Sequence, residues 1–209
     1  IRHADPSGEV TLLSADAHPF YLRPQLADFI GGKVPEAALA AKPADFYAQN
    51  RLTLRLNATV AGVDAAHRQV RLADGSLLSY DALLIASGGR PIPAPFPGGE
   101  LNGVVTLKTL ADAQSIKAKL ATAKRAVIVG EGLLGLEMSR ACRQAGLEVI
   151  YLLRGERFWP EILDNDAADL VERRLQDKYI TLLRQATVTE ALGSGGRLRY
   201  VTTSDGQTL

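Results

Sequence analysis

The feature that most constrains the fold is a glycine-rich turn between two apolar runs. A short β-branched run over residues 126–129 is typical of a buried strand. The glycines that follow it have the spacing G-x-G-x-x-G: Gly130, Gly132 and Gly135. A helical pattern then covers residues 136–145, and a second apolar run covers 147–153. A strand–turn–helix–strand unit with this spacing predicts a dinucleotide-binding βαβ unit.

Each glycine has a physical reason to be there. Gly130 allows the tight turn that leaves the strand, Gly132 lacks the Cβ that would block a pyrophosphate, and Gly135 lets the helix pack close to the strand. The phosphates are expected at the free N–H groups and positive end of the helix, and Leu133 and Leu134, between the last two glycines, are counted with the nucleotide-binding residues. The alternative is a glycine-rich turn in an ordinary βαβ unit without a nucleotide.

The composition excludes several classes of function. Of 209 residues, 46% are hydrophobic and 22% are charged, which is ordinary for a globular protein in water. A formal net charge of +1 gives no reason to expect a nucleic acid or a membrane surface as partner. A single cysteine excludes an internal disulfide and favours a reducing, cytoplasmic setting. The three histidines lack metal-ligand spacing, so no metal site is expected: His3, His18 and His67.

The first half of the chain predicts short strands with few helices. Helices are expected near 26–30 and after 42, and strands at 9–13, 52–56, 59–63, 69–72 and 77–80. Asp74-Gly75 predicts a hairpin turn between the last two strands. The continuous apolar run 82–86 predicts a fully buried parallel strand.

A segment rich in proline and glycine, 91–103, is the best candidate for a domain boundary. We therefore expect one domain over 1–105 and another over 106–209. In the second, helices are predicted from 106 to 120 and over 164–175, a strand at 180–183, and a hairpin of 198–202 with 207–209. The sequence begins like the last turn of a helix and ends inside a hairpin, so we expect a piece of a longer protein.

Four segments, in this order, resemble a known family: 20–26 (Phe-Tyr-Leu-Arg-Pro-Gln-Leu), 80–91, 127–137 and 158–160 (Phe-Trp-Pro). The family is the FAD-dependent pyridine nucleotide-disulfide oxidoreductases, in the branch of NAD(P)H-dependent rubredoxin, ferredoxin and nitrite reductases. The resemblance implies an α/β fold with two Rossmann-like, three-layer ββα nucleotide-binding domains, both incomplete at the chain ends. The first glycine motif of the FAD domain would precede residue 1, and a C-terminal domain would follow residue 209.

The resemblance also implies positions for the cofactors. The residues assigned to FAD are Asp16, Arg23, Pro24, Val60, Ala86, Ser87 and Gly88, and Glu137 matches an acid near the nicotinamide. From the residues alone, Asp16 could instead be a turn residue, Arg23 part of a surface ion pair and Glu137 an exposed helical acid. The redox cysteine of oxidase relatives is absent near Pro24, and Cys142 is expected to be buried packing.

The choice between NADH and NADPH depends on the end of the second strand of the unit. An NADH site usually has an acid there, but this chain has Leu153, followed by Arg154 and Arg157. The missing acid and the two arginines favour NADPH, because an arginine can hold a 2′-phosphate. Alternatively, Glu156 reaches the ribose and both arginines are solvated.

The function implied is an FAD-dependent oxidoreductase that moves a hydride from NAD(P)H to flavin and electrons on to a small redox protein or centre. The alternatives are an NAD(P)H oxidase and a nucleotide-binding module without turnover. The sequence leaves the electron acceptor and the oligomeric state open.

Overall fold

A computed structural model describes residues 1–2 and 4–209, so the predicted absence of a metal role for His3 lies outside the described residues. The chain forms two compact units, each made of two stretches. The first comprises residues 1–22 and 37–89, and the second comprises 23–36 and 90–209. The predicted division at residue 105 into an FAD and an NAD(P)H domain is a statement about ligands and stays a prediction.

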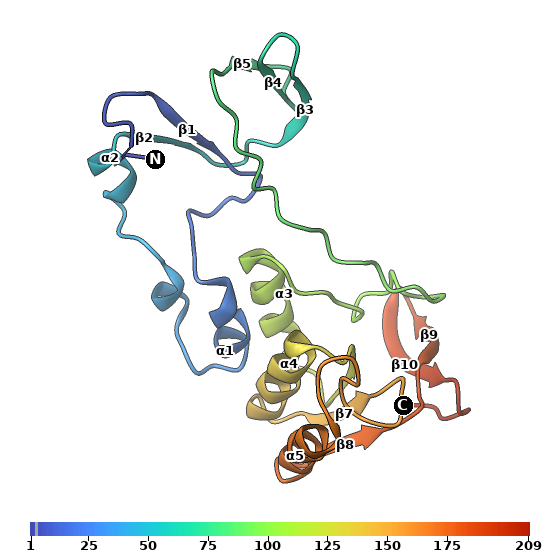
Figure 1. Cartoon of the computed structure of the whole chain (residues 1–209). Helices are drawn as coiled ribbons and strands as arrows, with labels where there is room; N and C mark the ends of the chain where they lie inside the picture. Colours follow the sequence, from blue (N-terminus) through green and yellow to red (C-terminus); the bar gives the residue numbers. More distant parts are fainter. Residues whose placement is uncertain (3) are drawn as a thin grey trace. The chain divides into compact units, whose positions relative to one another are not determined.

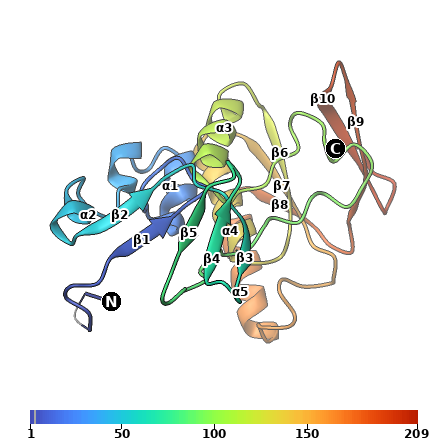
Figure 2. The same cartoon turned by 90° about the horizontal axis from the view of Figure 1, so that it is seen from above.

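The first unit holds two small sheets. The strands β1 (Val10–Leu13) and β2 (Leu52–Arg55) pair in parallel, and β3 (Val60–Asp64), β4 (Gln69–Leu72) and β5 (Leu77–Ser79) form an antiparallel sheet. Figure 2 shows the three strands of this second sheet side by side. The short helix α2 (Phe46–Gln49) leads into β2. The predicted hairpin turn is present, since Gly75 has φ +86° between β4 and β5.

The predicted strand at 82–86 is wrong. Residues 82–90 form no strand and are exposed throughout, with Leu84 at 80% and Ile85 at 70% exposure. A parallel strand needs a neighbour that supplies its hydrogen bonds, and β1 pairs only with β2 in the described part of the chain. Hydrophobic character alone therefore does not bury this run.

The second unit is built on a parallel sheet of β6 (Arg125–Val129), β7 (Glu148–Leu152) and β8 (Ile180–Leu183), with β7 in the centre. The longer helices are α3 (Leu110–Leu120), α4 (Leu133–Gln144) and α5 (Asn165–Gln176). Thr109 and Asp112 form a capping box at the start of α3, and the Asp164 side chain caps α5. These caps explain why α3 begins at Leu110, four residues after the predicted start, and why α5 begins at Asn165, one residue after it.

The two faces of β7 contact different layers, because successive side chains of a strand point to opposite sides. Val149 and Tyr151 pack with Cys142 of α4 and with Ala168 and Leu175 of α5. Ile150 and Leu152 instead pack with the segment that leads into the terminal hairpin, through Ala186 and Val188. Helices on one face and a β layer on the other give the predicted three-layer ββα arrangement (Figure 1).

The terminal hairpin differs in part from the prediction. Its strands are β9 (Val188–Ser194) and β10 (Arg197–Thr203), which pair antiparallel around Gly195 and Gly196. The predicted pairing with 207–209 is a minor addition, consisting of a bridge between Thr202 and Thr208 and of hydrogen bonds between Val201 and Leu209. The sequence of β9 alternates weakly, so the prediction missed it.

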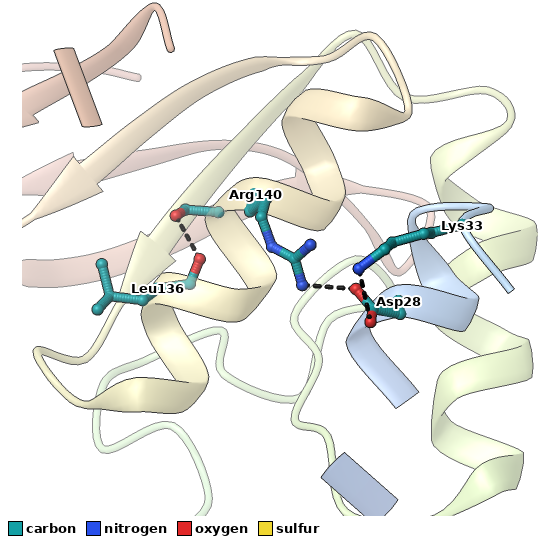
Figure 3. A network of polar contacts seen from close by, with 5 residues as sticks. Asp28, Lys33, Leu136 and Arg140 are labelled. Atoms are coloured by element: carbon teal, nitrogen blue, oxygen red, sulfur yellow. Dashed lines mark hydrogen bonds and ion pairs between the residues drawn. The ribbon is translucent and has the colours of Figure 1, made fainter. Parts of the chain in front are cut away.

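The second unit also includes α1 (Leu26–Ile30), which packs against α3 and α4. A Cβ on Gly31 would lie 3.1 Å from Cα of Ala141, so the two segments are in close contact. The Asp28 carboxylate accepts a 2.5 Å hydrogen bond from Arg140 of α4 and a 3.3 Å bond from Lys33 (Figure 3). Burial disfavours the charged carboxylate, but the bonds and charges of Arg140 and Lys33 outweigh burial and lower the pKa of Asp28.

Among the described residues, no helix has both the length and the apolar character needed to cross a bilayer.

Candidate functional site

The candidate nucleotide site is the turn between β6 and α4. Gly130 has φ +125°, a backbone conformation that favours glycine, so the chain can leave β6 sharply. The hydroxyl of Tyr151, on the neighbouring strand β7, donates a 2.5 Å hydrogen bond to the carbonyl oxygen of Gly130. The turn is thus anchored to the centre of the sheet.

The three glycines of the motif have different surroundings. A Cβ on Gly135 would overlap the carbonyl oxygen of Gly130 and the Tyr151 hydroxyl, so this glycine is required by packing within the protein. A Cβ on Gly130 or Gly132 would meet no atom within 4 Å. The space over these two glycines is open, as the approach of a pyrophosphate to the main chain requires.

The first turn of α4 supplies donors for an anion. Gly132 is the N-cap, no side chain caps the helix, and the first turn contains no acid. Leu133 and Leu134, which open α4, are both exposed. An uncapped N-terminus of a twelve-residue helix beside an open glycine turn fits the diphosphate of a dinucleotide.

A buried carboxylate lies within the turn. Glu131 has a side-chain exposure of only 6%, and its Oε1 accepts a hydrogen bond from the main-chain N–H of Arg154. The same oxygen lies 3.9 Å from Nε of the Arg154 guanidinium. Burial and, secondarily, the negative charge of Glu131 raise the pKa of Tyr151, which keeps this hydroxyl protonated and able to donate to Gly130.

The end of β7 carries the residues predicted to select the nucleotide. Leu153 is fully buried, whereas the Arg154 side chain is 73% exposed. The guanidinium of Arg157 instead donates to the carbonyl oxygens of Leu163 (2.6 Å) and Pro160 (3.3 Å), within its own loop. Glu156 accepts a bond from Gln185 at 3.2 Å. The contribution of each residue to nucleotide choice stays a prediction.

Two further predicted residues lie on α4. Glu137 is half-buried on its second turn, and its role near a nicotinamide stays a prediction. Cys142 is buried in the core beneath α4, and burial raises the pKa of its thiol to about 11. The burial of Cys142 among the apolar side chains of the core agrees with the prediction that this cysteine is a packing residue.

The residues assigned to FAD are divided between the two units. In the first unit, the Asp16 carboxylate accepts bonds from Tyr21 Oη (2.7 Å) and from the main-chain N–H of His18 (3.2 Å). The carbonyl of Asp16 accepts a 3.1 Å bond from the N–H of Asn57, so the end of β1 lies beside the segment before Val60. Val60 and the residues Ala86, Ser87 and Gly88 are exposed.

Arg23 and Pro24 belong to the second unit, in the short 3-10 helix η1 (Arg23–Gln25) before α1. The guanidinium of Arg23 donates a 2.8 Å bond to the carbonyl oxygen of Lys108. The structure therefore brings the motif glycines and Arg154 together at one turn, leaves Glu137 on the next turn of α4 and Arg157 bonded within its own loop, and brings Asp16 close to the segment before Val60. The proposed contacts of all these residues with FAD stay predictions.

The whole chain, residues 1–209, matches the model of the pyridine nucleotide-disulphide oxidoreductases. The chain belongs to this family. A probable ferredoxin reductase of Castellaniella defragrans is 32% identical over 98% of the chain and 50% of its own length. A rubredoxin-NAD(+) reductase of Pseudomonas putida is 28% identical over 100% of the chain and 54% of its own length. The chain thus spans about half the length of the curated relatives it matches.

Solved structures of similar proteins agree with this assignment. A ferredoxin reductase from Rhodopseudomonas palustris superposes with a TM-score of 0.93 at 26% identity, over 100% of this chain and 52% of that one. Putidaredoxin reductase in its covalent complex with putidaredoxin gives the same TM-score and identity, over 100% of this chain and 51% of that one. The α/β fold expected from the sequence is confirmed.

Two side chains of the site were missed in the sequence analysis. The sequence predicts Tyr151 only as part of a buried strand. The hydrogen bond from its hydroxyl to Gly130 depends on the tertiary structure. Glu131 occupies the second position of the glycine motif, beside the expected phosphates. An acid beside the expected phosphates is unusual, because its charge repels an anion, and this feature of the sequence indicates that Glu131 has a special role.

Proposed function

We propose that the protein is an FAD-dependent oxidoreductase that takes a hydride from NAD(P)H and passes electrons to a small redox protein. The observation that carries the proposal is the turn between β6 and α4, which is open over Gly130 and Gly132 and uncapped at the helix. The relatives support the proposed acceptor, since they include a rubredoxin-NAD(+) reductase and a reductase in complex with putidaredoxin.

In this proposal the chain's own residues bind and orient the nucleotide. The N–H groups at the start of α4 hold the diphosphate, and Tyr151 keeps the turn in place through Gly130. Glu137, one turn further along the helix, is the acid near the nicotinamide. The flavin, when bound, supplies the redox chemistry by accepting a hydride and releasing electrons singly or in pairs.

We propose that FAD contacts residues from both units: Asp16, Arg23, Pro24, Val60 and the exposed residues Ala86, Ser87 and Gly88. The position of Asp16 at the end of β1 supports its role, because an acid there can accept bonds from a ribose. Its bond from Tyr21 uses Oδ2 and its bond from His18 uses Oδ1, so the carboxylate is already fixed in orientation.

For the nucleotide we propose a modest preference for NADPH. The buried Leu153 takes the place of an acid at the end of β7, and the exposed guanidinium of Arg154 is free to approach a 2′-phosphate. Arg157 contributes less in this proposal, because its donors are used within the loop. A cytoplasmic location is also proposed, supported by the single buried and reduced cysteine, Cys142.

The test is a visible absorption spectrum of the purified protein with added FAD, before and after anaerobic NADPH. A flavin band that bleaches, and returns when a rubredoxin or ferredoxin is added without oxygen, supports the proposal. Bleaching that only oxygen reverses indicates an oxidase. The measurement is repeated with NADH. If FAD binds but neither NADPH nor NADH bleaches its absorption band, the protein is a binding module and the proposal fails.

A further inference from the structure

The buried carboxylate of Glu131 has no role in the function proposed so far. It lies in the turn that receives the diphosphate, where a negative charge weakens anion binding. Its side chain is 6% exposed, yet the cation nearest to it, Nε of Arg154, is 3.9 Å away. A carboxylate that is buried and this far from a cation needs hydrogen-bond donors to compensate for the lost water, either from the protein or from a ligand.

The position of Glu131 follows from the sheet. The strands β6 and β7 are parallel, with Val129 opposite Leu152, so the residues after each strand meet at the same edge. The hydrogen bond from the N–H of Arg154 to Glu131 joins these two strand ends directly. In a βαβ nucleotide site this edge, beside the end of the second strand, receives the adenosine ribose.

One oxygen of Glu131 is still available. Oε1 takes both the N–H of Arg154 and the contact with its guanidinium, and Oε2 has no hydrogen-bond partner among the described residues. Among the residues that the structure describes, every fully buried side-chain nitrogen or oxygen has a hydrogen-bond partner. Oε2 is therefore not fully enclosed by the protein, so a donor from a ligand can reach it.

We propose that Glu131 is a specificity-determining residue for the nucleotide, acting as the acid that is missing from the end of β7. Its Oε2 accepts a hydrogen bond from a ribose 2′-hydroxyl, and its charge opposes a 2′-phosphate at the same place. Glu131 and Arg154 thus act in opposite directions, and the preference of the protein is their balance. This inference rests on the proposed function, because it requires that a dinucleotide binds at this turn.

The experiment compares the dissociation constants of NADPH and NADH, measured by fluorescence titration of the protein and of Glu131→Gln. Glutamine keeps an acceptor for the N–H of Arg154 but removes the charge. We expect the ratio of NADPH affinity to NADH affinity to rise roughly tenfold, the effect of one charge-assisted interaction.

The matched control is Glu148→Gln at the opposite end of β7. It removes the same charge from an exposed ion pair with Arg125 (2.9 Å), so the affinity ratio should not change. Circular dichroism shows whether each variant is folded. If Glu131→Gln is not, Glu131→Asp and Glu131→Ser are compared instead: aspartate keeps the charge and the wild-type ratio, whereas serine raises the ratio.

The outcomes separate the two proposals. If both nucleotides bind and the ratio stays the same in Glu131→Gln, or falls, the role of Glu131 is refuted while nucleotide binding stands. An equal change in the affinities of both nucleotides makes Glu131 a purely structural residue and also refutes it. If neither nucleotide binds the wild-type protein, the proposed function itself fails.

Discussion

Two segments of this chain have nearly the same local pattern and different structures. Both are short apolar runs followed by glycine, 126–130 and 82–88. The first is the strand β6, paired along its whole length with β7 and followed by the nucleotide turn. The second is an exposed, unpaired segment with Leu84 and Ile85 in solvent.

The difference lies in where each run finds its partner. For β6 the partner strand and the covering helix follow within the next 25 or so residues, as in any βαβ unit. For the run 82–88, a partner would have to come from β1 or beyond it, and no described strand takes that place. The unit from β6 to β7 contains both the partner strand and the covering helix, whereas the run 82–88 has no partner strand among the described residues.

The largest expected effect tests the local unit at its most crowded point. We expect Gly135→Val to destabilise the second unit by more than about 4 kcal/mol, because the new side chain overlaps Gly130 and Tyr151. Urea unfolding measures this loss. Gly132→Ala is the matched control, since its Cβ meets no protein atom: the free energy of unfolding should stay the same while nucleotide binding weakens. Equal stability of both variants would contradict the close packing described here.

An intermediate effect compares a leucine of β7, the strand that pairs with β6, with a leucine of the run 82–88. Leu152→Ala, in the core below the sheet, should cost about 3 kcal/mol, because it leaves a cavity between β7 and the hairpin layer. Leu84→Ala removes the same atoms from an exposed position and should change the stability by less than about 0.5 kcal/mol. A large loss in Leu84→Ala would show that the run is buried in solution, contrary to the structure.

The smallest effect concerns a contact between segments far apart in sequence, the ion pair of Asp28 with Arg140. Because the pKa of Asp28 is lowered in the folded protein, the pair stabilises the fold above the usual aspartate pKa. That contribution disappears as the pH falls below about 4. We expect Asp28→Asn to lower the free energy of unfolding by about 0.5–1 kcal/mol at neutral pH, since Arg140 is partly exposed.

Urea unfolding of the wild type and Asp28→Asn at several pH values checks this prediction. The two proteins should become equally stable only in acid well below the usual aspartate pKa, once Asp28 is protonated in the folded as well as the unfolded state of the wild type. A difference in stability that persists unchanged in acid would mean that Asp28 stabilises the fold through packing and not through its charge.

The sequence predicted the elements whose partners are near in the chain. The unit from β6 to β8 and the turn at Gly75 were found because period, capping and glycine spacing are local properties. The strand β9 was missed because its sequence alternates weakly, and the exposure of 82–86 was missed because it depends on which strand is available as a neighbour. In the site, the glycines were predicted from spacing, but the bonds of Tyr151 and Glu131 cross between strand ends and have no local pattern.

The place of α1 in the second unit has a consequence for synthesis of the protein. Residues 23–36 leave the ribosome before the helices that cover α1, which are made only after the whole stretch 37–89 of the other unit. During that interval the apolar side chains of α1, buried in the finished protein, have nothing to pack against: Leu26, Ala27, Phe29 and Ile30. A helix of five residues is not stable alone. The nascent chain therefore exposes this short apolar, aggregation-prone segment until α3 and α4 have been synthesised.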